Sequence, residues 1–168
     1  MNIHESIIIE SINTIDNAYG RITHCTNQLD DSHIWHRLDE NVNSIGIIIQ
    51  HLCGNLRQWV YAGIGNKKDV RNRPLEFKDN EKKCKIDLIE MFAQTIEECK
   101  TTIRQIKYDN LLAPRRIQGF EGTILSAMFD TIPHLELHAG QIVFITRMIL
   151  KENFELRWKP LTKEEGTE

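Results

Sequence analysis

Residues 86–106 read IDLIEMFAQTIEECKTTIRQI, and the apolar side chains of this stretch recur every three or four positions. This spacing places them on one side of an α-helix, while Glu and Lys side chains lie between them on the other side. The apolar stripe consists of Ile86, Ile89, Phe92, Ile96, Cys99, Ile103 and Ile106. An amphipathic helix of this kind must bury its stripe against other elements, so the rest of the chain is expected to supply them.

Three other segments show the same helical period. The helices that they predict cover about residues 3–27, Ser44 to Gly63 or Gly65, and about 123–151. Ser44 is suited to cap a helix N-terminus, and Pro133 is expected to kink the last helix because its ring removes one backbone hydrogen bond. No strand pattern competes. Four helices of this length predict an all-α fold, a four-helix bundle with long loops at about residues 28–43, 64–81 and 109–122.

Composition and charge argue against a nucleic-acid-binding protein and a membrane protein. The 168 residues include 21 Lys and Arg and 24 Asp and Glu, a formal net charge of −3, which argues against a nucleic-acid partner. No apolar run approaches the roughly 18 residues of a membrane-spanning helix, and no secretory signal opens the chain, so we expect a cytoplasmic protein without a membrane partner. The four cysteines lack Cys-x-x-Cys spacing, which favours free thiols. Residues 1–150 are expected to form one domain, and residues 151–168 a tail that packs in part and then frays.

The strongest chemical signal is the pair His134 and His138 in the last predicted helix. At about 100° per residue these two imidazoles lie within roughly 40° of each other, so both can bind one ion. Glu136, between them, points roughly 200° away from both, which argues against a general base and against the His-Glu-x-x-His pattern of metalloproteases. Asp130 and Gln141 extend the polar stripe on the side of His134, and each is either a partner of a metal ligand or part of a polar groove.

A third ligand must come from another helix, and His51 is the candidate. It lies on the flank of the apolar stripe of the second predicted helix, with Asn55 one turn later as a further polar neighbour of the site. The alternative is that His51, His134 and His138 are hydrogen-bonded core histidines without a metal.

The combination of segments resembles a known group of proteins. Residues 43–55, NSIGIIIQHLCGN, and residues 134–142, HLELHAGQI, resemble the DinB/YfiT-like superfamily in order and in placement on helices. The resemblance covers about residues 3–150 and implies a three-histidine site for a divalent metal at His51, His134 and His138. It also implies that Trp35 lies near the mouth of the pocket. Residues 71–77, RNRPLEF, resemble a segment of one subgroup of that superfamily.

The resemblance implies a metal-dependent enzyme acting on a small molecule. Zinc or nickel is the expected ion, with iron as another option, because imidazole suits all three. A low-molecular-weight thiol is the implied cosubstrate, with S-transfer, hydrolysis or isomerisation as the reaction. Two alternatives stay open: a non-enzymatic metal- or ligand-binding stress-response protein, and a purely structural helical bundle. A homodimer is compatible with all three.

Overall fold

The computed structural model describes residues 2–78 and 82–158. Four long helical segments dominate this part of the chain: α1 (Ile3–Asn27), α3 (Ile45–Leu56) with its π-helical continuation η1 (Arg57–Ile64), α5 (Lys85–Arg104) and α6 (Ile124–Leu150). The shorter elements are α2 (Asp31–Ile34), α4 (Arg73–Glu76), η3 (Tyr108–Asn110), η4 (Lys151–Asn153), β1 (Pro114–Ile117) and β2 (Phe120–Thr123). The long helices match the segments predicted from the apolar period.

Side-chain caps fix where these helices begin. The Ser44 hydroxyl accepts a hydrogen bond from the backbone N–H of Ile47, so the start predicted for the second helix is confirmed. Asn2 and Thr123 cap α1 and α6 in the same way, and each also donates its own backbone N–H to the side chain three positions later. The register of α3 and α6, which carry the three histidines, is therefore set locally.

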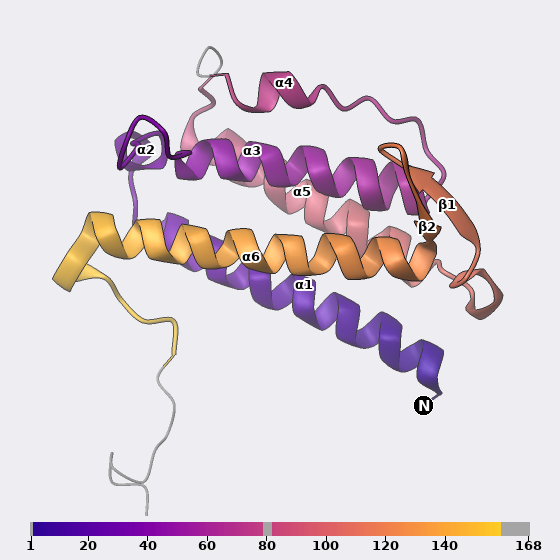
Figure 1. The fold of residues 1–168 in the computed structure, drawn as a ribbon. Coiled ribbons are helices and arrows are strands. Elements are labelled where there is room, and N and C mark those ends of the chain that lie inside the picture. The colour runs from indigo at the N-terminus through magenta and orange to yellow at the C-terminus, as the bar shows by residue number, and fades with distance from the viewer. Residues whose placement is uncertain (1, 79–81, 159–168) are drawn as a thin grey trace, which may run out of the picture.

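The four long helical segments run side by side (Figure 1) and share one apolar core. Helix α1 contacts α5 and α6, and α3 contacts the same two helices. The predicted stripe of α5 supplies fully buried side chains to this core, among them Phe92, Cys99 and Ile103. Burial of these stripes is the main favourable contribution to folding. Because α3 packs on α6, one polar flank of each helix can meet the other.

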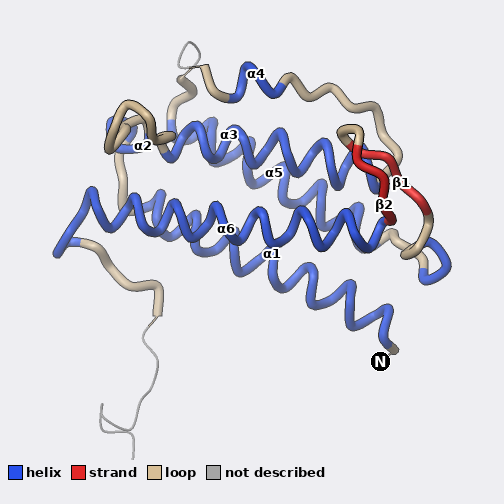
Figure 2. Tube along the Cα trace, in the orientation of Figure 1, coloured by secondary structure: helices blue, strands red, loops and turns tan. Residues whose placement is uncertain are grey.

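The expectation of an all-α chain is wrong at residues 114–123. Strands β1 and β2 pair there as an antiparallel hairpin, with Ile117 opposite Phe120. The two turn residues, Gln118 and Gly119, have φ of 54° and 87°, which is the left-handed backbone of the tight turns that join paired strands. The hairpin lies beside the first turns of α6 and against η1 (Figure 2). It thereby forms a wall at the end of the helices.

Two further expectations concern α6 and the tail. Helix α6 runs through Pro133 as one element from Ile124 to Leu150. After it, Phe154 packs against the core and the backbone carbonyl of Glu155 accepts a hydrogen bond from Nε2 of His24, at 2.7 Å. The expected fraying at residues 163–168 lies outside the described residues. Across residues 2–78 and 82–158, no helix combines the length and apolarity needed to cross a membrane.

Candidate metal centre

The three predicted histidines meet where α3 faces α6. Nε2 of His134 lies 3.4 Å from Nε2 of His51 and 3.2 Å from Nε2 of His138. One ring nitrogen from each of the three side chains lies within 4.8 Å of the others. Within the ranges 2–78 and 82–158 no other group of three His, Cys, Asp or Glu side chains is placed to hold an ion in this way. The spacing of His134 and His138 predicts that these two rings meet, and the resemblance to DinB/YfiT-like proteins implies that His51 joins them.

The distances between the ring nitrogens fit a small divalent cation. Nitrogens bound to a tetrahedral zinc at about 2.0–2.1 Å are separated by about 3.3 Å. The separations of 3.2 and 3.4 Å at His134 are close to that value. Ligands on two rigid helices hold such spacing better than ligands on loops. The donor set therefore fits a metal with three imidazole ligands.

The orientation of His51 is set by Glu76. Nδ1 of His51 lies 2.9 Å from Oε2 of Glu76. Because a carboxylate only accepts hydrogen bonds, Nδ1 carries the hydrogen, and Nε2 presents its lone pair to the other two histidines. The Phe77 ring packs beside the imidazole, with 5.3 Å between the ring centroids. His51 is thus held in the tautomer that a metal ligand requires.

His138 is oriented in the same manner by Gln141. Its Nδ1 donates to the amide oxygen of Gln141 at 2.7 Å, which leaves the lone pair on Nε2. Two lone pairs, from His51 and His138, are therefore aimed at Nε2 of His134, which has at most one hydrogen to donate. In the described part of the chain, the buried Nδ1 of His134 has no hydrogen-bond partner. A cation between the three Nε2 atoms would satisfy all three lone pairs.

The protonation states agree with this geometry. Burial, together with the neighbouring charges of His138, His51 and Arg71, lowers the pKa of His134 to about 4. Burial also lowers the pKa of His138, although its bond to Gln141 opposes that shift. Both rings are therefore neutral at pH 7, as a metal ligand must be.

Two charged residues complete the support of His51. Arg71 donates from Nε to Oε1 of Glu76 at 2.6 Å and from Nη2 to Oε2 at 2.8 Å. The Arg71 side chain is 3% exposed and that of Glu76 is 9% exposed. Burial raises the pKa of the Glu76 carboxyl, but hydrogen bonds from Arg71 and His51 outweigh it and hold the pKa below its ordinary value. A Cβ at Gly54 would overlap this carboxylate, so the glycine on α3 makes room for it.

A cavity of about 520 Å³ opens onto His51 and His134. Its lining consists further of Asn55, Asp130, Trp59, Arg71, Arg73, Gln118, Phe120 and Thr131. The buried Oδ1 of Asn55 and Oγ1 of Thr131 have no hydrogen-bond partner within residues 2–78 and 82–158. Trp59 and Phe120 form an aromatic wall, with ring centroids 6.3 Å apart. The cavity thus combines apolar walls with polar groups that are free to bind a ligand.

The position of Trp35 corrects one expectation. Its ring covers Gly46 at the start of α3, and its Nε1 donates to the carbonyl of Lys83 at 2.9 Å. It is absent from the described lining of the histidine cavity, where Trp59 supplies the indole instead. Trp59 follows the apolar period of α3 and η1, so the sequence pattern alone does not distinguish it from a core residue.

Two neighbours of the histidines in the sequence take no part in the centre. Glu136 faces away from the histidines and pairs with Arg21 on α1. Cys53 is buried, and burial raises the pKa of its thiol to about 12, so it would be a poor thiolate ligand.

Comparison with known proteins supports the fold. Residues 2–163 match the family described as "Protein of unknown function (DUF1572)". The chain belongs to the DUF1572 family. A search of curated proteins found no match for this DUF1572 chain.

Solved structures similar to this DUF1572 protein include DinB-like proteins. A conserved protein from Enterococcus faecalis has a TM-score of 0.71 at 16% identity, over 89% of this chain and 98% of its own. The DinB-like protein YjoA from Bacillus subtilis has a TM-score of 0.68 at 14% identity, over 89% of this chain and 96% of its own. A DinB-like protein from Bacillus cereus has a TM-score of 0.63 at 13% identity, over 79% and 85% of the two chains. The predicted DinB-like resemblance is thereby confirmed for the fold.

Proposed function

We propose that this DUF1572 protein is a metal-dependent enzyme whose divalent ion, zinc or nickel, is held by Nε2 of His51, His134 and His138. The observation that carries the proposal is the convergence of these three nitrogens, two of them with the opposite ring nitrogen fixed by a hydrogen bond to Glu76 or Gln141. Three neutral imidazoles leave a coordination position open to a small molecule, as in catalytic rather than structural zinc sites.

The proposed reaction is the transfer of a low-molecular-weight thiol. When bound, a divalent ion with imidazole ligands lowers the pKa of a coordinated thiol or water. In the transfer, a carbon–sulfur bond forms as the bond from that carbon to its leaving group breaks, and the leaving group keeps the electron pair. The choice of a thiol rests on the resemblance to DinB/YfiT-like proteins.

Other residues of this chain would position the metal ligands, bind the substrate and exclude water. Glu76, with Arg71 behind it, and Gln141 hold the imidazoles in place. The unpartnered oxygens of Asn55 and Thr131 would bind polar groups of the substrate. The aromatic wall of Trp59 and Phe120 would exclude water from its apolar part.

Three further features belong to the proposal. We take α1, α3 with η1, α5 and α6 to be the four helices of a DinB/YfiT-like four-helix bundle. Their mutual packing and the similarity to DinB-like structures support this topology. A cytoplasmic location and a homodimer are likewise proposed, on the resemblance alone.

The test combines metal content with thiol transfer. The full chain is loaded separately with zinc and nickel, desalted, and analysed for metal beside His134→Ala and His138→Ala. The exposed His36 lies outside the site, so His36→Ala is the matched control. We expect about one ion per chain in the wild type and in the control, loss in both site variants, and metal-dependent transfer of a small thiol to an alkyl or aryl halide.

Other outcomes would identify the alternatives. Stoichiometric metal without transfer of any thiol tested would point to a non-enzymatic metal- or ligand-binding stress-response protein. No bound metal in the wild type would contradict the proposal and leave a structural helical protein with hydrogen-bonded core histidines.

A further inference from the structure

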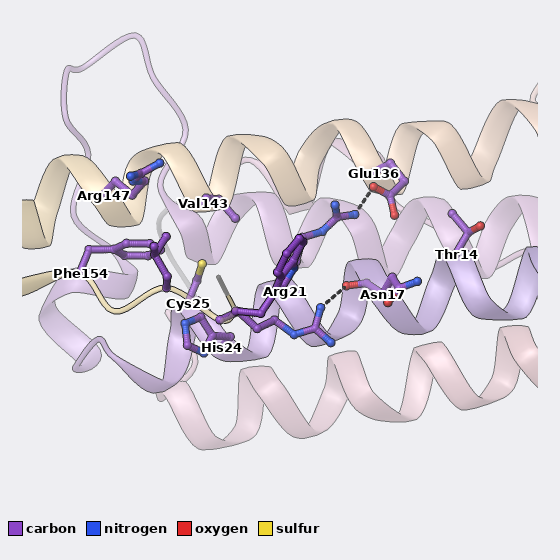
Figure 3. A pocket seen from close by; sticks show the side chains of 12 residues that line it. Thr14, Asn17, Arg21, His24, Cys25, Glu136, Val143, Arg147 and Phe154 are labelled. Carbon is purple, nitrogen blue, oxygen red and sulfur yellow. Dashed lines mark hydrogen bonds and ion pairs between the residues drawn. The ribbon is translucent and has the colours of Figure 1, made fainter. Parts of the chain in front are cut away.

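A second cleft lies on the other side of α6 from the histidines. It has a volume of about 560 Å³ and is bounded by α1, α6 and residues 154–158 (Figure 3). Glu136 on its wall is two residues from both His134 and His138, and so points about 200° away from them around the helix. Helix α6 therefore separates this cleft from the metal centre.

The cleft is rich in positive charge. Arg21 from α1, Arg147 from α6 and Arg157 from the C-terminal segment line it together with His24. Glu136 is the sole carboxylate among the described lining residues. Three guanidinium groups against one carboxylate leave a surplus of two positive charges when His24 is neutral. Guanidinium groups from three different elements thus line one cleft, which favours binding of an anion.

Two of the guanidinium groups have hydrogens to donate. Arg21 pairs with Glu136, as the dashed line in Figure 3 shows. Arg147 lies over the ring of Phe154, 5.3 Å from its centroid, and Arg157 makes one long bond of 3.5 Å to the carbonyl of Asn17. No carboxylate within the described ranges pairs with Arg147 or Arg157. In addition, the buried Nε of Arg21 lacks a hydrogen-bond partner there.

The surroundings hold these groups in place and add an apolar wall. A Cβ at Gly20 would lie 2.7 Å from Nη2 of Arg157, so the absence of a side chain on α1 lets the guanidinium approach. Phe154 orients Arg147 by stacking. Leu156 and Trp158 line the same cleft, yet they remain 51% and 68% exposed. Large apolar side chains beside unpaired guanidinium groups suit a ligand that has an apolar part and a negative charge.

We propose that this cleft binds an amphiphilic organic anion, a carboxylate carried on an apolar chain. The unpaired guanidinium groups of Arg147 and Arg157 attract the carboxylate into the cleft, where the planar donors of a guanidinium match its two oxygens. Phe154, Leu156 and Trp158 cover the apolar chain. The volume of the cleft lies within the range of about 300–1,000 Å³ that is usual for small-molecule sites.

The test is calorimetric titration of the full chain with octanoate. Octanol supplies the same apolar chain without charge, and acetate supplies the charge without the chain. The same titrations are run on His138→Ala, which lacks one of the three histidines. This variant distinguishes binding in the cleft from binding at the metal centre. We expect octanoate to bind both proteins equally, and octanol and acetate to bind at least about tenfold more weakly.

Variants test the assigned residues. Arg147→Gln and Arg157→Gln should each weaken octanoate binding about tenfold or more, and Arg147→Lys should weaken it less, because it keeps the charge but loses the planar pair of donors. Both arginines are exposed, so the variants should retain the wild-type circular dichroism. Arg116→Gln, on the hairpin with a side chain 72% exposed, is the matched control and should bind normally.

The proposal would be overturned by absence of octanoate binding at millimolar concentration, by equal binding of octanol, or by an equal loss of binding in Arg116→Gln. Loss of binding in His138→Ala would instead assign the carboxylate to the metal centre and would also overturn it.

Discussion

Replacing Glu76 by Gln should weaken metal binding and destabilise the metal-free protein, for separate reasons. The Glu76 carboxylate accepts bonds of 2.6 and 2.8 Å from Arg71 and one of 2.9 Å from Nδ1 of His51. Glutamine has nearly the same shape but carries no charge, and one of its two oxygens becomes an NH₂ group. That group faces an N–H of Arg71 or of His51, so at least one bond is lost.

The magnitudes follow from burial. Arg71 is 3% exposed and would lose its counter-charge, and removing one partner of a buried ion pair costs about 3–5 kcal/mol of stability. His51 would lose the acceptor that fixes its tautomer, and loss of such a partner typically costs about 10–100-fold in metal affinity. By the usual conversion this is about 1.4–2.7 kcal/mol of binding free energy.

The assay for Glu76→Gln has two parts. Competition with a chelator gives the Kd for zinc, and urea denaturation of the metal-free protein gives the free energy of unfolding. The control is Glu98→Gln, because Glu98 pairs with Arg57 at 2.9 Å but the two side chains are 25% and 34% exposed. It should cost at most about 1 kcal/mol of stability and leave the Kd unchanged. A Kd within about twofold of wild type in Glu76→Gln would refute the role of Glu76 in orienting His51.

Three other predictions concern pH, packing and assembly. Folding lowers the pKa values of His134 and His138, that of His134 from 6.5 to about 4. Between these two pH values the unfolded state binds more protons than the folded state. The metal-free protein should therefore lose stability as the pH falls from 6.5 towards 4. Urea midpoints at about pH 7.5 and about pH 5 would show this, and a midpoint that rises at the lower pH would contradict it. Gly54→Ala should displace the Glu76 carboxylate and weaken zinc binding about tenfold, as the same chelator competition would measure; an unchanged Kd would show that the carboxylate can shift freely. For the proposed homodimer, light scattering coupled to gel filtration should give twice the chain mass. A single chain mass would exclude that assembly.

The apolar period of the sequence was sufficient to place the long helices. It repeats over many turns in each of them, and the caps at Ser44 and Thr123 are local signals. The hairpin was missed because each strand has four residues and its turn, Gln118-Gly119, is a weaker signal than Asn-Gly. The π-helical segment Arg57–Ile64 keeps an apolar face, so its change of hydrogen bonding leaves no trace in that pattern.

The histidine cluster was predictable because two of its members share one helix at a spacing that fixes their relative direction. His51 was found because it is a polar residue on an apolar flank. The sequence pattern does not assign Arg71 and Glu76 to the site, since a connection between helices has no period from which burial can be inferred. The one local signal is Gly54, about one turn after His51, because a glycine on a helix can make room for a side chain from another element, here that of Glu76.

X-ray absorption at the zinc edge of the zinc-loaded protein would show directly which atoms bind the ion. The structure predicts three imidazole nitrogens at about 2.0–2.1 Å and one further nitrogen or oxygen. His138→Ala, treated in the same way, should retain no zinc to measure. A sulfur at about 2.3 Å, or fewer than three imidazoles in the wild type, would contradict a centre built from His51, His134 and His138.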